Sequence, residues 1–171
     1  MKARIRKAVR SDVPLILELV RALAEFEKLA HEVVATEDSL SRTLFDEKPC
    51  AEVLILEVTE GPESATGWDS AGFALFFTTY STFLAKPGIY LEDLYIRPEL
   101  RSRGYGRKML QRLAHIAVER RCGRLEWSVL DWNVRARRFY EDLGAKLMGE
   151  WTVHRLAGAA LGALADEGPR E

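Results

Sequence analysis

The sequence predicts a layered α/β (α+β) protein with a single domain over residues 1–171. Segments in which apolar and polar residues alternate indicate strands, and segments with apolar residues three and four positions apart indicate helices. The chain has 171 residues, 47% of them hydrophobic, which suits one domain whose core needs no disulfide or metal. Strands and helices follow one another without internal repeats or a low-complexity linker, which favours one layered structure.

The N-terminal part predicts a strand followed by a long amphipathic helix. Residues 2–8 alternate between basic and apolar side chains, as a half-buried strand does. Ser11 or Asp12 is a suitable cap for the helix, and Pro14 suits its first turn. This helix is expected to end near residue 30.

A second, shorter helix and three further strands are expected next. Thr36 is the predicted cap of this helix, which ends near Phe45. Segment 59–70 is rich in Gly, Pro, Ser, Thr and Asp and is predicted to be an exposed hairpin loop, while Pro87 and Gly88 predict a turn. The predicted strands cover residues 53–58, 72–80 and 89–96.

The last third of the sequence changes to a helical period. Leu110, Leu113 and Ala117 lie on one face of a helix predicted over 106–121. Gly144 is the expected C-terminal cap of a later helix. The remaining expected elements are a strand at 125–130, that helix at 134–143, a last strand at 151–156 and a frayed helix or disordered tail at 157–171.

Charge and hydropathy exclude several classes of protein. The chain has 25 Lys and Arg against 26 Asp and Glu, so it lacks the basic field that nucleic-acid binding requires. The longest apolar run is far shorter than a membrane span, and the N-terminus does not resemble a secretory signal. We therefore expect a cytoplasmic protein that has no membrane or nucleic-acid partner.

The cysteines and histidines do not suggest a metal site. Cys50 and Cys122 are far apart, and the three histidines follow no metal-ligand spacing. Reduced, partly buried cysteines are the expectation, and no metal cofactor is predicted.

A glycine-rich segment, RSRGYGRK at residues 101–108, lies between a predicted strand and a predicted helix. Glycines allow backbone N–H groups to form a nest, and the helix N-terminus adds partial positive charge, so this segment is suited to bind a pyrophosphate. A glycine-rich turn with solvated arginines is the alternative. The segment lacks the Lys-Ser/Thr ending of a P-loop and the first-strand position of a dinucleotide fingerprint, which argues against ATP and NAD.

Four motifs then occur in a familiar order: LEDLYIRP at 91–98, RxxGxG at 101–106, DWN at 131–133 and RFYxxxGA at 138–145. Together they resemble the GNAT superfamily of acetyl-coenzyme A dependent N-acetyltransferases. Residues 23–28 and 150–153 are similar to the spermidine/spermine acetyltransferase branch, which includes the thialysine acetyltransferases. The resemblance therefore covers nearly the whole chain.

The resemblance implies a GNAT fold, in which a mixed, mostly antiparallel sheet is splayed at a central bulge and flanked by about four helices. Acetyl-coenzyme A would be the cosubstrate and would lie in the resulting slot. Its pantetheine would pair with the backbone of Leu94, Tyr95 and Ile96. The pyrophosphate would be held by Ser102, Arg103, Gly104, Tyr105, Gly106 and Arg107, with Arg101 and Lys108 adding charge around it, and the other wall would be lined by Asn133, Arg135 and Ala136.

Physical chemistry makes the implied catalytic roles reasonable. A primary amine is almost wholly protonated at neutral pH, and removing its proton costs roughly 4.6 kcal/mol. Glu92 is the candidate general base, directly or through a water, and Tyr140 matches the family's general acid for the departing thiolate. Direct attack needs no covalent intermediate, so neither cysteine is assigned a role.

Five residues are candidates for substrate binding, and four of them have an ordinary structural alternative. Glu92 and Asp93 would attract a cation but are also compatible with solvated strand carboxylates. The resemblance points to Glu27 as an amine contact, although a charged helix surface is the default. Trp132 would either cap the substrate channel or belong to the core. Tyr140, the candidate general acid, is also compatible with an ordinary packing aromatic. Glu150 completes the set.

The expected acceptor is a small cationic amine. The segment after the general acid has fewer carboxylates than the resemblance to polyamine enzymes leads us to expect, which favours thialysine, a lysine-like amino acid or a diamine over a polyamine. Enzymes of this branch are commonly dimers that exchange C-terminal strands, so a homodimer is implied. A catalytically silent acyl-coenzyme A sensor and a protein lysine or N-terminal acetyltransferase are the alternatives; retention of Glu92 and Tyr140 argues against the sensor.

Overall fold

The computed structural model describes residues 1–61 and 67–168. The chain forms two compact units, one over residues 1–128 and one over 129–171. The first unit contains the sheet and three of the described α-helices, and the second contains the other two.

The first unit is built on a five-stranded sheet with strand order β1-β2-β3-β4-β5. Strands β1 to β4 pair antiparallel with their neighbours, and β5 pairs parallel with β4. The expectation of a mixed, mostly antiparallel sheet is therefore confirmed. The strands are β1 (Lys2–Lys7), β2 (Glu52–Thr59), β3 (Asp69–Ser81), β4 (Lys86–Ile96) and β5 (Leu125–Trp127).

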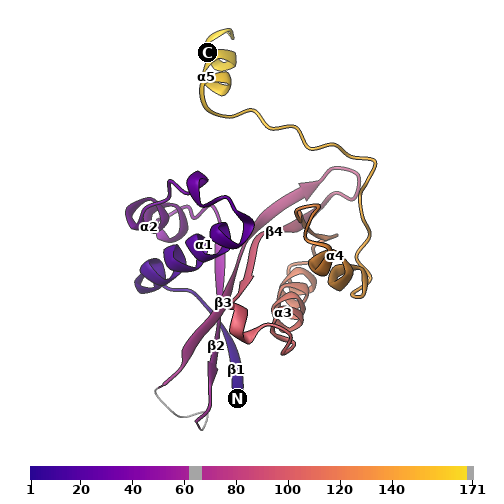
Figure 1. Ribbon diagram of the computed structural model, residues 1–171. Helices are drawn as coiled ribbons and strands as arrows, with labels where there is room; N and C mark the ends of the chain where they lie inside the picture. The colour runs from indigo at the N-terminus through magenta and orange to yellow at the C-terminus, as the bar shows by residue number, and fades with distance from the viewer. Residues whose placement is uncertain (62–66, 169–171) are drawn as a thin grey trace. The chain divides into compact units, whose positions relative to one another are not determined.

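Three α-helices of this unit cover the sheet, with α1 and α2 on one face and α3 on the other (Figure 1). Their bounds are Val13–Glu27 for α1, Glu37–Phe45 for α2 and Tyr105–Glu119 for α3, and short 3-10 turns occupy Arg10–Asp12, Ala30–Glu32 and Pro98–Leu100. Burial of the apolar stripe of α1 against the sheet removes apolar surface from water and stabilises this layer. Its core contains Ile16, Leu19, Leu23, Leu44, Val53, Ile55, Phe73 and Tyr95.

The helix starts follow local sequence chemistry. The predicted cap Thr36 accepts a hydrogen bond from the backbone N–H of Ser39 at 3.1 Å. Asp12 precedes α1 as expected, but its carboxylate accepts from the backbone N–H of Val9 at 2.7 Å and from Arg6. Asp12 therefore fixes the strand-to-helix turn rather than the first turn of α1.

A β-bulge interrupts β4 in the middle of the sheet. Leu75 of β3 lies opposite Asp93, whereas the next residue, Phe76, lies opposite Leu91, so Glu92 has no partner in the register. The extra residue bends the strand and disrupts the ladder locally. On the other edge of β4, pairing with β5 extends only over Ile89 to Leu91. The sheet thus opens at the bulge, as the resemblance implies.

Boundaries of β4 and β5 differ from the sequence-based expectation. The β3–β4 turn lies at residues 82–85, and Pro87 and Gly88 belong to β4. Proline is tolerated there because pairing with β5 begins only at Ile89, so its missing N–H interrupts no ladder on that side. Strand β5 ends at Trp127, three residues before the predicted end.

The β2–β3 connection is shorter than predicted. Strand β2 continues to Thr59 and β3 begins at Asp69, so both strands extend into the segment expected to be a loop. Residues 62–66 of that predicted loop lie outside the described residues.

The second unit contains α4 (Val134–Glu141) and α5 (Gly158–Asp166). The strand predicted at 151–156 is wrong, because these residues have no regular structure. A strand needs a neighbour with which to pair, and the described part of this unit contains no strand. Across residues 1–61 and 67–168, no helix has the length and apolar character needed to cross a bilayer.

Candidate active site

The edge of β4 that follows the bulge has backbone groups available for a ligand. The N–H of Arg97 donates to the carbonyl oxygen of Ala71 in β3 at 2.9 Å. Because peptide groups alternate along a strand, those of Ile96 and Leu94 lie on the opposite edge. Pairing with β5 has already ended at Leu91 there. An extended chain could therefore add to β4 at this edge, as the resemblance implies for pantetheine.

The end of β4 is firmly held. The guanidinium of Arg97 donates to the carbonyl oxygen of Ser70 at 2.8 Å and to the carboxylate of Glu18 on α1 at 2.7 Å. Gly72 in β3 permits a close approach, because a Cβ there would collide with the carbonyl oxygen of Tyr95. These contacts fix the position of the open edge relative to α1 and β3.

The glycine-rich segment connects this edge to α3. Ser102 and Gly104 both have left-handed backbones, with φ of 64° and 81°. Gly104 is the N-cap of α3 and has no side chain to accept from the N–H groups of the first turn. These N–H groups, with the positive end of the helix dipole, are therefore suited to an anion such as a pyrophosphate. Tyr105 is buried and anchors the helix start.

Arg101 makes two contacts within the fold. Its Nε donates to the carbonyl oxygen of Ile96 at 2.9 Å, and its guanidinium lies 4.3 Å from the ring centroid of Phe26 on α1. Arg101 therefore links the glycine-rich segment to β4 and α1. Arg103 and Arg107 are exposed beside the start of α3, where their charge faces solvent.

Three carboxylates gather near the bulge. Glu27 is the last residue of α1, and Glu92 and Asp93 lie at the bulge of β4. Burial, together with the negative charges of Glu92 and Glu27, raises the pKa of Asp93 to about 6. Burial also raises the pKa of Glu27.

This carboxylate cluster, defined as Glu27, Glu92 and Asp93, contains no matching cation. Among the described residues, none of its members forms an ion pair with a Lys, Arg or His side chain. A buried carboxylate without a counter-ion is unfavourable, and a bound cation would relieve it. The arrangement is therefore suited to an ammonium group.

The remaining predicted residues belong to the second unit. Asn133 caps α4, because its Oδ1 accepts from the backbone N–H of Ala136 at 3.2 Å, so its side chain is engaged in the fold. Arg135 lies in the first turn of the same helix. Tyr140 lies in its last turn, with its ring centroid 5.3 Å from that of Phe139. Asn133, Arg135, Ala136 and Tyr140 are thus brought together on one short helix.

Trp132 and Glu150 lie outside the regular elements of the second unit. Trp132 immediately precedes the N-cap of α4 and is 51% exposed, so it is not a core residue of the kind that its size would suggest. Glu150 lies in the segment between α4 and α5 and is exposed.

The sequence did not indicate two of the features that shape the site. Arg101 was expected to add charge near a phosphate, and its contacts with Phe26 and Ile96 join residues far apart in the chain. The alternation of apolar and polar residues in β4 also does not predict the bulge, which only the resemblance implies. Of the two cysteines, Cys50 is exposed and Cys122 is partly buried.

Comparison with known proteins identifies a family and relatives of this chain. Residues 21–145 match the acetyltransferase (GNAT) family. The chain is 38% identical to L-ornithine N5-acetyltransferase NATA1 of Arabidopsis thaliana, over 96% of this chain and 88% of that protein. It is also 38% identical to thialysine N-epsilon-acetyltransferase of Bos taurus, over 94% of this chain and 96% of that protein.

Solved structures share the fold of this chain. An integron cassette protein from the mobile metagenome of V. cholerae superimposes with a TM-score of 0.74 at 25% identity, covering 96% of this chain and 98% of that one. An aminoglycoside acetyltransferase from a soil metagenome has a TM-score of 0.70 at 16% identity, over 91% of this chain and 95% of that one, which shows a shared fold. The chain belongs to the acetyltransferase (GNAT) family and is an acetyltransferase of that family.

Proposed function

We propose that this protein transfers the acetyl group of acetyl-coenzyme A to a side-chain amine of a small diamino acid such as ornithine or thialysine. The main support is the carboxylate cluster, which lacks a cation and lies next to the open edge of β4. The names of the two relatives, an ornithine and a thialysine acetyltransferase, point to the same class of acceptor.

The first unit offers two features that fit acetyl-coenzyme A. The peptide groups of Leu94 and the N–H of Ile96 face an edge without a neighbouring strand, which suits the amides of pantetheine, while the carbonyl oxygen of Ile96 accepts from Arg101. The first turn of α3 offers N–H donors after Gly104, which suits the pyrophosphate. The coenzyme supplies an acetyl thioester. The residues proposed to hold it are Leu94, Tyr95, Ile96, Arg101, Ser102, Arg103, Gly104, Tyr105, Gly106, Arg107, Asn133, Arg135 and Ala136.

Arg101 contributes to this set through position. Its hydrogen bond to Ile96 and its stacking on Phe26 hold the segment that leads into α3. Asn133 likewise contributes by starting α4, since its side chain is the cap.

The substrate is proposed to bind through its positive charge. A primary ammonium near Glu27, Glu92 and Asp93 would replace the missing counter-ion of the carboxylate cluster. Trp132 and Glu150 are proposed as further substrate contacts. A compact cluster of three carboxylates suits a short amino acid better than a long polycation, whose several charges would each need a partner.

The proposed reaction is direct attack. Glu92 accepts a proton from the substrate ammonium, directly or through a water, and the resulting amine attacks the acetyl carbonyl carbon. An N–C bond forms and the C–S bond breaks, so the electron pair of that bond leaves on the coenzyme sulfur, and the nitrogen releases its second proton to solvent to give the neutral amide. Tyr140 donates the proton that turns the thiolate into a thiol, since a phenol and a thiol have similar pKa values. Neither cysteine takes part.

We also propose one acetyltransferase domain and a homodimer. The family match at 21–145 continues across residue 128, where the two compact units meet in sequence, which supports a single functional domain. The segment between α4 and α5 has no regular structure and exposes apolar side chains that a second copy would cover. They are Leu147, Met148, Trp151, Val153 and Leu156.

The test is release of coenzyme A thiol over a panel of acceptors: ornithine, thialysine, lysine, putrescine, spermidine and a lysine-containing peptide. We expect the fastest release with the diamino acids, and loss of that release in Glu92→Gln. Release with the peptide alone would favour a protein acetyltransferase. Acetyl-coenzyme A binding without release from any acceptor would favour a sensor, and either result would overturn the proposal.

A further inference from the structure

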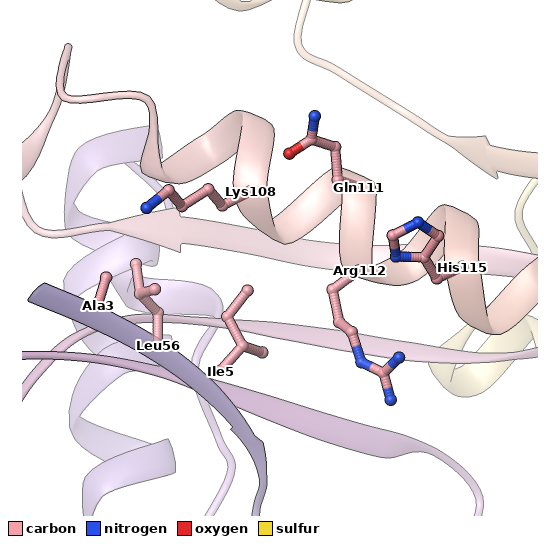
Figure 2. A pocket seen from close by; sticks show the side chains of 7 residues that line it. All are labelled: Ala3, Ile5, Leu56, Lys108, Gln111, Arg112 and His115. Atoms are coloured by element: carbon pink, nitrogen blue, oxygen red, sulfur yellow. The ribbon is translucent and has the colours of Figure 1, made fainter. Parts of the chain in front are cut away.

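A pocket of about 260 Å³ lies between α3 and the first two strands of the sheet (Figure 2). Its floor is apolar and consists of Ala3 and Ile5 of β1 and Leu56 of β2. Four polar side chains from successive turns of α3 form its other wall: Lys108, Gln111, Arg112 and His115. Figure 2 shows these side chains on the helix that crosses over the strands.

The positive charges of the polar wall are only partly paired with acidic side chains of the protein. Arg112 has a long ion pair with Glu119, at 3.7 Å. Within the described part of the chain, Lys108 forms no ion pair, and Gln111 and His115 form no side-chain hydrogen bond. No carboxylate lines the pocket. The wall therefore favours an anion, and the floor favours an apolar group.

Apart from Lys108, the last residue of the glycine-rich segment, this pocket shares no residue with the proposed coenzyme site. It lies over β1 and β2, whereas the open edge belongs to β4, two strands further along the sheet. Neighbouring strands are about 4.8 Å apart, so the two places are separated by roughly 10 Å across the sheet. The polar wall of the pocket begins at Lys108. The N–H donors proposed for the pyrophosphate lie before it, at the start of α3.

We propose that the pocket between α3 and the β1–β2 strands is a second binding site, for a small organic anion with one carboxylate or phosphate head and a short apolar body. The head group lies at Arg112, where a charge-assisted hydrogen bond is available, and Lys108 adds a second positive charge toward the other end of the pocket (Figure 2). The apolar body packs against the floor and removes the exposed surface of Ala3 and Ile5, which are only partly buried, from water. This inference does not depend on the identity of the acetyl acceptor.

Calorimetry with the whole protein saturated with coenzyme A tests the proposal. Hexanoate and phenyl phosphate are the two anionic probes, which distinguish carboxylate from phosphate recognition, and hexanamide is a neutral control of the same size. We expect at least one anion to bind and hexanamide to bind at least about tenfold more weakly, because loss of a charge-assisted contact is worth a factor of that order.

Two variants locate the binding. Arg112→Gln removes one cation, and Ala3→Phe fills the floor, so the first should weaken binding of the anion by about tenfold and the second should abolish it. Lys48→Gln removes one charge at an exposed position away from the pocket and should leave binding unchanged. Coenzyme A affinity serves as the check that each variant is folded.

Several results would overturn the proposal. One is that neither anion gives a heat of binding in the millimolar range, and another is that hexanamide binds as tightly as the anions. A third is that the folded variants Arg112→Gln and Ala3→Phe bind the anion as the wild type does. Displacement of the probe by coenzyme A would also contradict it, because the pocket would then belong to the coenzyme site. None of these results bears on acetyl transfer itself.

Discussion

The side chain of Arg101 donates from Nε to the backbone carbonyl oxygen of Ile96 at 2.9 Å. This contact joins the end of β4 to the glycine-rich segment that begins α3, and the same guanidinium stacks on Phe26 of α1. One side chain thus connects the strand edge, the proposed phosphate-binding turn and the helix that carries Glu27. The relative positions of these three parts depend on Arg101.

Arg101→Met should therefore disturb the site without removing a phosphate contact. We expect acetyl-coenzyme A to bind about tenfold more weakly and the free energy of unfolding to fall by about 1–2 kcal/mol, the usual range for a lost partly buried hydrogen bond and cation–π contact. Calorimetry and urea denaturation measure the two effects. Arg103→Met, at an exposed arginine, is the matched control for stability, and an equal loss of stability in both variants would refute the positioning role.

Gly104→Val tests the turn at the start of α3. A Cβ at this position meets no atom within 4 Å, so the substitution is strained only by the φ of 81°. A β-branched residue in this left-handed conformation costs about 1–2 kcal/mol and turns the N–H donors away from the anion. Weaker acetyl-coenzyme A binding is expected by calorimetry. Gly104→Asn tolerates this conformation and should retain most of the affinity; unaltered affinity in Gly104→Val would argue against the pyrophosphate site.

Asp93→Asn should stabilise the protein at neutral pH. The folded-state pKa of Asp93 is about 6, above that of an unfolded aspartate. The folded state therefore holds its proton more tightly, and the free energy of unfolding falls as pH rises from about 4 to about 6, by at most about 3 kcal/mol. Above about pH 6 the ionised Asp93 destabilises the folded state by the full amount, and below about pH 4 this destabilisation is absent.

Urea denaturation of the wild type and Asp93→Asn at about pH 4.5 and about pH 7.5 measures this difference. The stability gain of the variant should be larger at the higher pH. Asp69→Asn, at an exposed aspartate, is the control and should show no comparable dependence. A gain that is equal at both pH values would show that Asp93 titrates like an ordinary surface carboxylate.

Tyr140→Phe tests the proposed general acid. Removal of the hydroxyl leaves the ring that lies beside Phe139, so α4 should keep its packing. We expect turnover to fall by about 10²–10⁴-fold, the usual contribution of acid catalysis, with acetyl-coenzyme A affinity intact. Phe139→Leu is the control for aromatic packing. Steady-state kinetics that show unchanged turnover in Tyr140→Phe would remove Tyr140 from the mechanism.

Local sequence patterns predicted most of the helices and strands. The apolar stripe of α1, the Thr36 cap and the strand at β2 each depend on spacing or on a single side chain near in sequence, and all three occur. The prediction failed at Pro87–Gly88 and at 151–156, where the outcome depends on neighbouring strands. A turn-forming dipeptide can occupy a strand end, and an alternating segment without a partner forms no strand.

The site was predicted only in part for the same reason. The motifs at 91–98 and 101–106 identified the open edge and the turn, because they are continuous in sequence. The approach of Glu27 to Asp93, and that of Arg101 to Phe26, depend on how α1 packs on the sheet, which no local pattern describes. The raised pKa of Asp93 is likewise a property of this packing, since burial is its largest cause.

The most direct test of acetyl transfer to a small diamino acid is a competition experiment. The protein is incubated with acetyl-coenzyme A and an equimolar mixture of ornithine, thialysine, putrescine and spermidine, and the products are identified by mass spectrometry. We predict that N-acetylated ornithine or thialysine forms first and that Glu92→Gln forms little of either. Acetylated spermidine as the main product, or no acetylated amine although acetyl-coenzyme A binds, would contradict the account.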